Sequence, residues 1–192
     1  MLIGICGMQG SGKTTLRKEL LKRIPNSIDL DIDIIAHDIY NNPDCFNEVT
    51  STFKDITTNG KIDRKKLGDI VFSSPDEMLK LTNCTWKYME QIIDKFISDN
   101  KDKVIILDWL LLHNTKFLKQ CDIRILLDID QDIRMERVIK RDNISKERFL
   151  FRDNANIPYK KEEFNYIYKE LDIDKIERMI KEYEKSTISR EF

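Results

Sequence analysis

The sequence predicts an α/β fold in which a five-stranded parallel sheet carries helices on both of its faces. Short apolar runs alternate with amphipathic helical patterns, and this alternation is typical of parallel sheets because parallel strands need long crossover connections. A glycine-rich stretch between the first apolar run and the first helical pattern supports the same fold. We expect strands at residues 2–6, 27–30, 103–107 and 122–127, and a weaker one at 164–168.

Helical patterns separate these strands. Apolar residues recur on one face at residues 14–24, 76–98, 131–140 and 172–185. Residues 41–100 depart from the alternation, because they contain two or three successive helical patterns and no convincing strand. We interpret them as a helical insertion, which either shapes an acceptor site or only adds packing. We therefore expect one domain over residues 1–192, with this insertion and a helical lid at about 137–160.

The composition excludes several classes of protein. The chain has 33 basic and 34 acidic residues, and this balance argues against a general nucleic-acid binder. Its four cysteines are widely spaced, which predicts neither a zinc site nor a disulfide framework. The N-terminal stretch lacks a basic leader, and no apolar run approaches the roughly 20 residues of a spanning helix. We expect a cytoplasmic protein that binds neither nucleic acid nor membrane and is a monomer or a weak homo-oligomer.

The glycine-rich stretch GMQGSGKT, residues 7–14, fits the phosphate-binding pattern G-x-x-x-x-G-K-[ST]. It lies directly after an apolar strand and before an amphipathic helix, so its backbone N–H groups and the helix N-terminus can surround a phosphate. Lys13 would reach the β and γ phosphates, and the Thr14 hydroxyl would ligate Mg²⁺. The predicted ATP-binding residues are Gly10, Ser11, Gly12, Lys13, Thr14 and Thr15.

Asp108 ends the strand predicted at 103–107. A carboxylate there is suited to holding Mg²⁺ through water or to orienting Thr14, although a helix cap or a solvated strand end is the alternative. The sequence argues against a regulatory GTPase, because no glycine follows an aspartate in a D-x-x-G pattern. Kinases and mechanical ATPases, which share this loop, stay open at this point.

Arginines cluster after the strand predicted at 122–127. Because they recur at three- and four-residue steps, several can share one side of a helix and close over a transferring phosphate. The alternative is a solvated face on which Glu136, Asp142 and Glu147 neutralise them. These arginines are Arg134, Arg137, Arg141, Arg148 and Arg152, and we assign catalytic roles to Arg137 and Arg141.

Several blocks of the chain together resemble the dephospho-coenzyme A kinase family. One block is the phosphate-binding loop, and another is Asp31-Ile-Asp33-Ile-Ile-Ala36-His37. The segment GKIDRKKLGDIVF from Gly60 is the most diagnostic, and VIILDWLLL and the pair Arg137 and Arg141 followed by Asp142 complete the set. The resemblance covers residues 1 to about 152. It implies ATP-dependent phosphorylation of the ribose 3′-hydroxyl of dephospho-coenzyme A, with Mg²⁺.

The resemblance also implies roles for acceptor-side residues. Asp33 is similar to the family's proposed base, and Asp31 would support it by holding Mg²⁺ or the acceptor. His37, Asp63 and Arg64 are similar to family residues near the acceptor, with a packing role as the alternative for His37. Asp38 is interpreted as a solvated helix start.

The sequence also departs from the family pattern. Asn83-Cys84-Thr85-Trp86 replaces a usual His-Pro, His113-Asn114 replaces a usual Phe-Glu, and Arg134 replaces a usual glutamine. Two alternatives therefore stay open, a nucleoside or nucleotide kinase and a nucleotide-binding protein without turnover.

Overall fold

The computed structural model describes residues 1–71 and 73–188, without the side chains of residues 33 and 188. The chain divides into two compact units. The first, Met1–Leu30 with Asn100–Phe192, is called the sheet unit, and the second, Asp31–Asp99, is called the helical unit.

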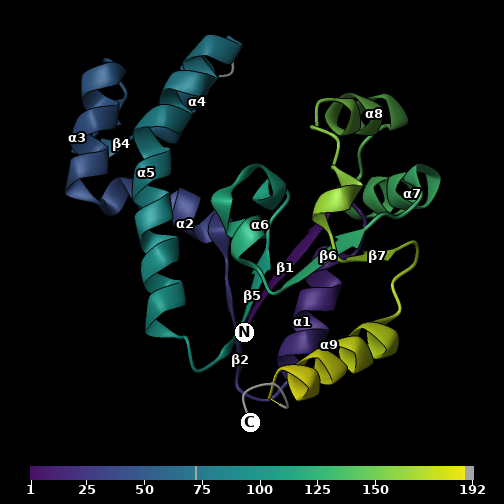
Figure 1. The fold of residues 1–192 in the computed structure, drawn as a ribbon. Coiled ribbons are helices and arrows are strands. Elements are labelled where there is room, and N and C mark those ends of the chain that lie inside the picture. The colour runs from purple at the N-terminus through teal and green to yellow at the C-terminus, as the bar shows by residue number, and fades with distance from the viewer. Residues whose placement is uncertain (72, 189–192) are drawn as a thin grey trace. The chain divides into compact units, whose positions relative to one another are not determined.

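The sheet unit is built on a five-stranded sheet in the order β2-β5-β1-β6-β7, with every neighbouring pair parallel. The expected α/β fold is confirmed, and the last strand is shorter than predicted (Figure 1). The strands are β1 (Leu2–Gly7), β2 (Ser27–Leu30), β5 (Val104–Asp108), β6 (Ile123–Leu127) and β7 (Tyr166–Tyr168).

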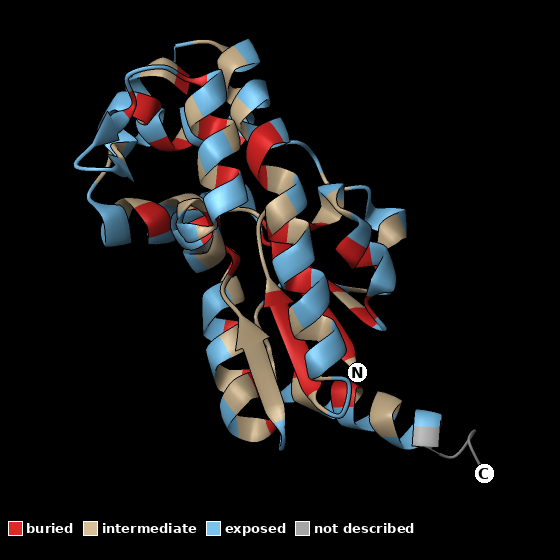
Figure 2. Ribbon diagram, turned by 90° about the vertical axis from the view of Figure 1, so that its left-hand side faces the viewer, coloured by how far each residue is buried: buried red, intermediate tan, exposed pale blue. Residues whose placement is uncertain are grey.

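Helices cover both faces of this sheet. The side chains of β1 point alternately to one face and the other, so each face packs apolar side chains against its own helices. Ile3 and Ile5 belong to one core cluster with residues of α1 (Lys13–Arg23) and α9 (Ile173–Ile188), such as Leu16 and Ile176. Gly4 faces the other side, where an added Cβ would lie 2.9 Å from Cys121 Sγ. This second face is covered by η2 (Leu112–Asn114) and α6 (Lys116–Gln120). Figure 2 shows β5 as mostly buried and the edge strand β2 as only partly buried.

Two further helices follow β6, α7 (Gln131–Asp142) and α8 (Lys146–Asn154), with η3 (Lys161–Glu163) before β7. Asp130 caps α7 by accepting a hydrogen bond from the Asp132 N–H at 2.9 Å, and Ser145 caps α8 in the same way through the Arg148 N–H. Between them Asn143 adopts a left-handed conformation with φ of 51°, which ends α7. The segment in which a lid is predicted, about 137–160, therefore contains parts of two helices, and the lid itself stays a prediction.

The helical unit contains α2 (Ile32–Asp38), η1 (Ile39–Asn41), α3 (Pro43–Thr52), α4 (Arg64–Val71) and α5 (Pro75–Asp99). The helices expected in the insertion are present. A short hairpin of β3 (Thr57–Thr58) and β4 (Lys61–Ile62), which the sequence pattern did not predict, is also present. Its turn residues Asn59 and Gly60 both have positive φ, as a two-residue hairpin turn requires.

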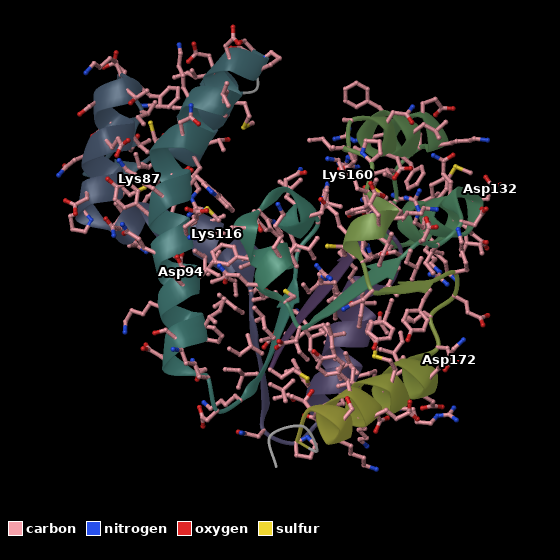
Figure 3. All side chains as sticks on the ribbon, in the orientation of Figure 1. Lys87, Asp94, Lys116, Asp132, Lys160 and Asp172 are labelled. Atoms are coloured by element: carbon pink, nitrogen blue, oxygen red, sulfur yellow. The ribbon has the colours of Figure 1, made fainter. Side chains whose placement is uncertain are left out.

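Charged side chains lie on the outer surfaces of both units, for example Asp94 on α5 and Asp132 on α7 (Figure 3). The four cysteines are buried thiols. None of the helices described in residues 1–71 and 73–188 has the length and apolar character needed to cross a membrane.

Candidate active site

The predicted phosphate-binding loop connects β1 to α1. Gly10 and Gly12 have φ of 81° and 97°, values that favour glycine because a Cβ would be strained there. An added Cβ at Gly10 would lie 2.6 Å from the Arg134 carbonyl oxygen, and one at Gly12 would lie 2.9 Å from Leu171. The loop is thus tightly packed between α7 and the segment before α9, and Gly12 is the N-cap of α1.

Ser11 lies inside the loop. Its N–H donates to the Met8 carbonyl at 3.1 Å, and its hydroxyl is fully buried, with no hydrogen-bond partner among the described residues. Its side chain therefore does not line the cleft over the loop. A binding role for Ser11 is limited to its backbone.

Lys13 and Thr14 begin α1, and their polar atoms lie at the carboxyl ends of β1 and β5. Lys13 Nζ donates to the Gly7 carbonyl at 2.7 Å, so the ammonium lies across the loop. The Thr14 hydroxyl donates to Asp108 Oδ2 at 3.4 Å. The carboxylate of Asp108 is only 7% exposed, and Arg17, one turn after Thr14, lies 3.8 Å from it.

The Thr14 hydroxyl and the Asp108 carboxylate, which meet at the end of β5, could hold a Mg²⁺ ion that is bound together with a nucleotide. Mg²⁺ prefers hard oxygen ligands and keeps several waters, so two such side chains suffice. Among the described residues there is no cluster of three or more His, Cys, Asp or Glu side chains suited to a metal.

A cleft of about 340 Å³ lies over the loop. Its volume falls in the range of about 300–1,000 Å³ that is usual for small-molecule sites. Both predicted catalytic arginines line it. The lining residues include Gln9, Gly10, Gly12, Lys13, Thr14, Thr15, Leu110, Arg137 and Arg141.

The two arginines already have partners within the sheet unit. Arg137 donates to the Gly10 carbonyl at 3.3 Å. Arg141 donates through two nitrogens to Asp142, at 2.6 and 2.9 Å, which helps to hold the pKa of Asp142 below its ordinary value. Because both guanidiniums are exposed, these contacts are weak enough for an anionic ligand to replace them.

The prediction that Arg134 closes over a phosphate is wrong. Its side chain is buried, and two of its nitrogens donate to Asp153 of α8, at 2.6 and 2.9 Å. Arg148 and Arg152 also do not continue the helix face of Arg137 and Arg141, because the chain turns at Asn143. A shared face for all five arginines requires one continuous helix, whereas the chain forms two helices here.

Tyr159 is a further residue of the site that sequence reasoning missed. Its hydroxyl accepts from the Gly7 N–H at 3.3 Å and donates to the Leu110 carbonyl at 3.2 Å, while its ring packs edge-on against His113 with centroids 4.4 Å apart. Burial raises the pKa of the hydroxyl, so Tyr159 stays neutral. It ties the segment after α8 to the first residue of the loop, a long-range contact for which the sequence has no local signal.

The acceptor-side residues predicted from the resemblance lie in the helical unit. Asp31 caps α2 by accepting from the Ile34 N–H at 3.1 Å. Asp38 ends α2 and is also the exposed N-cap of η1, so the predicted solvated helix start applies to this short 3₁₀ helix. The side chain of Asp33 lies outside the described part of the chain. A packing role for His37 is wrong, because its side chain is 65% exposed and contacts Asp38.

Arg64 and Asp63 are held at the start of α4. Arg64 donates to the His37 carbonyl, and its guanidinium lies 5.8 Å from the Tyr40 ring centroid. Asp63 accepts from the N–H groups of Lys65 and Lys66 and from the Thr58 hydroxyl, and these bonds, that of Lys66 first, lower its pKa. The structure thus brings His37 and Arg64 together, and Asp63 has a capping role.

A parallel five-stranded sheet, a G-x-x-x-x-G-K-[ST] loop between strand and helix, and arginines over the loop define a P-loop kinase. The family model described as dephospho-CoA kinase matches residues 1–165. The chain therefore belongs to the dephospho-CoA kinase family, as the sequence predicted, and this membership implies an ATP-dependent kinase with a small-molecule acceptor.

Individual relatives agree with this family. A dephospho-CoA kinase of Fusobacterium nucleatum is 35% identical over 149 residues, which cover 77% of this chain and 76% of that protein. One of Aquifex aeolicus is 32% identical over 160 residues, which cover 81% of this chain and 80% of that protein. The structure of a dephospho-CoA kinase from Campylobacter jejuni has the same fold, with a TM-score of 0.68 at 24% identity over 97% of this chain and 98% of that one.

Proposed function

We propose that this protein transfers the γ-phosphoryl group of ATP to the ribose 3′-hydroxyl of dephospho-coenzyme A, giving coenzyme A and ADP. The observation that carries the proposal is the cleft in which Lys13, Thr14, Arg137 and Arg141 converge, in a chain that belongs to the dephospho-CoA kinase family. The cleft supplies the cationic and backbone donors that phosphoryl transfer needs.

The loop residues would bind the phosphates of ATP. The N–H groups of the first turn of α1 have no partner within the helix ladder and carry the positive end of its dipole, so Gly12, Lys13, Thr14 and Thr15 are placed to donate to phosphate oxygens. Lys13 would exchange the Gly7 carbonyl for β- and γ-phosphate oxygens, since an ammonium interacts more strongly with an anion than with a neutral acceptor.

Mg²⁺ would be held by Thr14 directly and by Asp108 through water. When bound, the ion supplies charge neutralisation on the phosphates that react. The Thr14–Asp108 contact already places the two oxygens at one end of β5. Arg17, which bridges to Asp29 at 2.9 Å, lies 3.8 Å from the Asp108 carboxylate.

The lid arginines would stabilise the negative charge that develops during transfer. Arg137 would leave the Gly10 carbonyl, and Arg141 would leave Asp142, as each guanidinium turns to phosphate oxygens. This exchange needs only side-chain rotations, because both residues already line the cleft.

Asp33 would act as the general base, and Asp31 would support the acceptor or the metal. In this step the Asp33 carboxylate accepts the proton of the 3′-hydroxyl, the new O–P bond forms, and the bond from the γ-phosphorus to the departing ADP oxygen breaks. The chain supports this assignment because Asp33 follows Leu30, the last residue of a strand of the parallel sheet, by only three residues. Ligands of such sheets collect at the carboxyl ends of the strands.

The acceptor would be held by residues of the helical unit. Arg64 could grip a phosphate of dephospho-coenzyme A as a bidentate donor, and its contacts with the His37 carbonyl and the Tyr40 ring reduce the side-chain entropy lost on binding. Asp63 would act indirectly by fixing the first turn of α4.

A substrate panel tests the proposal. Purified protein is incubated with radiolabelled ATP and Mg²⁺, and with dephospho-coenzyme A, nucleosides or nucleoside monophosphates as acceptor. We expect transfer to dephospho-coenzyme A, and no transfer by a Lys13→Ala variant. Preferred transfer to a nucleoside or nucleotide would replace the acceptor, and binding of ATP without transfer to any acceptor would contradict the activity.

A further inference from the structure

Arg134 and Asp153 form a buried ion pair in the sheet unit. Only 6% of the surface of Arg134 and 8% of the surface of Asp153 is exposed. The guanidinium donates to both carboxylate oxygens, at 2.6 and 2.9 Å, and Gln131 donates to the same carboxylate at 2.9 Å. Buried ion pairs add little stability over apolar side chains of similar size, because both charges must be desolvated. Stability alone therefore does not account for this pair.

The other donors of Arg134 reach the backbone. Its Nε donates to the Ile129 carbonyl at 3.0 Å, at the exit of β6. Its Nη1 donates to the Gln9 carbonyl at 3.3 Å. Gln9 belongs to the phosphate-binding loop, 125 residues earlier in the chain. The Arg134 side chain therefore links β6, α8 and the loop.

The contact with Gln9 fixes one peptide group of the loop. In a planar trans peptide the C=O and N–H bonds point in opposite directions, so a carbonyl of Gln9 held by Arg134 turns the N–H of Gly10 away from the Arg134 guanidinium. The next N–H, that of Ser11, is already used by the Met8 carbonyl at 3.1 Å. The Gly10 N–H is thus the loop donor whose direction depends on Arg134.

The α7 backbone leaves little freedom for this peptide. The Arg134 carbonyl lies close enough to Gly10 that an added Cβ would be 2.6 Å away, and Arg137 donates to the Gly10 carbonyl at 3.3 Å. The two peptide groups on either side of Gly10 are therefore held from the same helix.

We propose that Arg134 is a positioning residue for nucleotide binding, which directs the Gly10 N–H to a phosphate oxygen by holding the Gln9 carbonyl, and that Asp153 keeps Arg134 in place. The inference rests on the proposed function only in that this loop binds the phosphates of a nucleotide.

The test separates positioning from stability with the charge-free double variant Arg134→Met/Asp153→Leu. Because both charges are removed together, we expect a melting temperature within a few degrees of the wild type. We expect the affinity for Mg²⁺–ADP, measured by titration calorimetry, to fall about 3- to 10-fold, the usual contribution of one hydrogen bond. The NMR shift of the Gly10 amide on ADP addition should shrink in parallel.

Ile180→Val is the matched control, because Ile180 is fully buried in the core beneath the sheet and has no part in the loop. It should lower the melting temperature and leave ADP affinity and the Gly10 amide response unchanged. A stable double variant with wild-type ADP affinity and a wild-type Gly10 response would overturn the proposal.

If the double variant does not fold, Arg134→Lys decides the matter. A lysine keeps the charge opposite Asp153, but its single ammonium cannot reproduce the fork that joins Asp153, Ile129 and Gln9. We expect the same loss of ADP affinity, and unchanged affinity would overturn the proposal. ADP binding needs no acceptor, so a wild-type protein that binds ADP without phosphorylating dephospho-coenzyme A would contradict the proposed function and leave this inference intact.

Discussion

Gly10→Ala should impair catalysis much more than it impairs folding. Gly10 has φ of 81°, and the added Cβ would lie 2.6 Å from the Arg134 carbonyl oxygen and 2.8 Å from Val138 Cγ2. The nearer atom belongs to the backbone of α7, which cannot rotate away as a flexible side chain can. The loop must therefore retreat from α7 by several tenths of an ångström before the methyl group fits.

Two effects determine how much stability and how much activity the Gly10→Ala variant loses. A left-handed conformation of alanine costs about 1–2 kcal/mol of stability. The displacement of the loop acts on function, because an error of about 1 Å in positioning can lower the rate about 10²-fold. Because the expected displacement is several tenths of an ångström, we expect turnover to fall about 10- to 10²-fold and ADP affinity to fall with it.

Gly60→Ala is a matched control. Gly60 has a similar φ of 73°, but an added Cβ there would meet nothing within 4 Å. This variant should lose a similar amount of stability from backbone strain alone and keep its ADP affinity. Calorimetric ADP titration, steady-state kinetics and thermal melting on both variants provide the comparison. Equal ADP affinity and turnover for the two alanine variants would refute the steric reasoning about the loop.

Other predictions concern charge. Asp33→Asn should cut turnover about 10²- to 10⁴-fold with little change in ATP affinity, the usual range for a positioned base, and near-normal turnover would remove Asp33 from that role. Arg141→Gln should lower turnover about 10-fold or more if its guanidinium stabilises the transition state, and an unchanged rate would leave Arg141 as a surface partner of Asp142. Burial acts to raise the pKa of Asp153, but hydrogen bonds from Arg134 and Gln131 outweigh it and lower the pKa below 3.8. Its contribution to stability is therefore complete above that value and is lost as the pH falls through the lower pKa of the folded state. The melting temperature of the wild type should therefore fall as the pH is lowered through this range, and that of Arg134→Met/Asp153→Leu should fall less steeply. Parallel plots of melting temperature against pH for the two proteins would contradict this.

The fold could be predicted because the sequence patterns that indicate it lie within short segments of the chain. Buried strands of a parallel sheet appear as apolar runs, and the loop motif marks the junction of β1 and α1. The hairpin of the helical unit had a local signal too, the dipeptide Asn59-Gly60, but its strands are two residues each and carry no periodicity.

The contacts of the site were harder to predict. Arg134 and Arg137 belong to one helix at a spacing that indicates a shared face, yet one is buried against α8 and the other lines the cleft. That difference arises from Asp153, whose position depends on the turn at Asn143. Tyr159 reaches Gly7 across 152 residues, and no pattern in a single sequence reports such a pairing.

Phosphate transfer to dephospho-coenzyme A is the reaction on which the proposed function depends, so its product is measured directly. The purified protein is supplied with ATP, Mg²⁺ and dephospho-coenzyme A, and the product is identified by phosphorus NMR and mass spectrometry. We expect coenzyme A, with the new phosphate on the ribose 3′-oxygen, and no coenzyme A from the Lys13→Ala variant. A wild-type protein that binds ATP but forms no coenzyme A, or that places the phosphate on another acceptor, would contradict the proposed function.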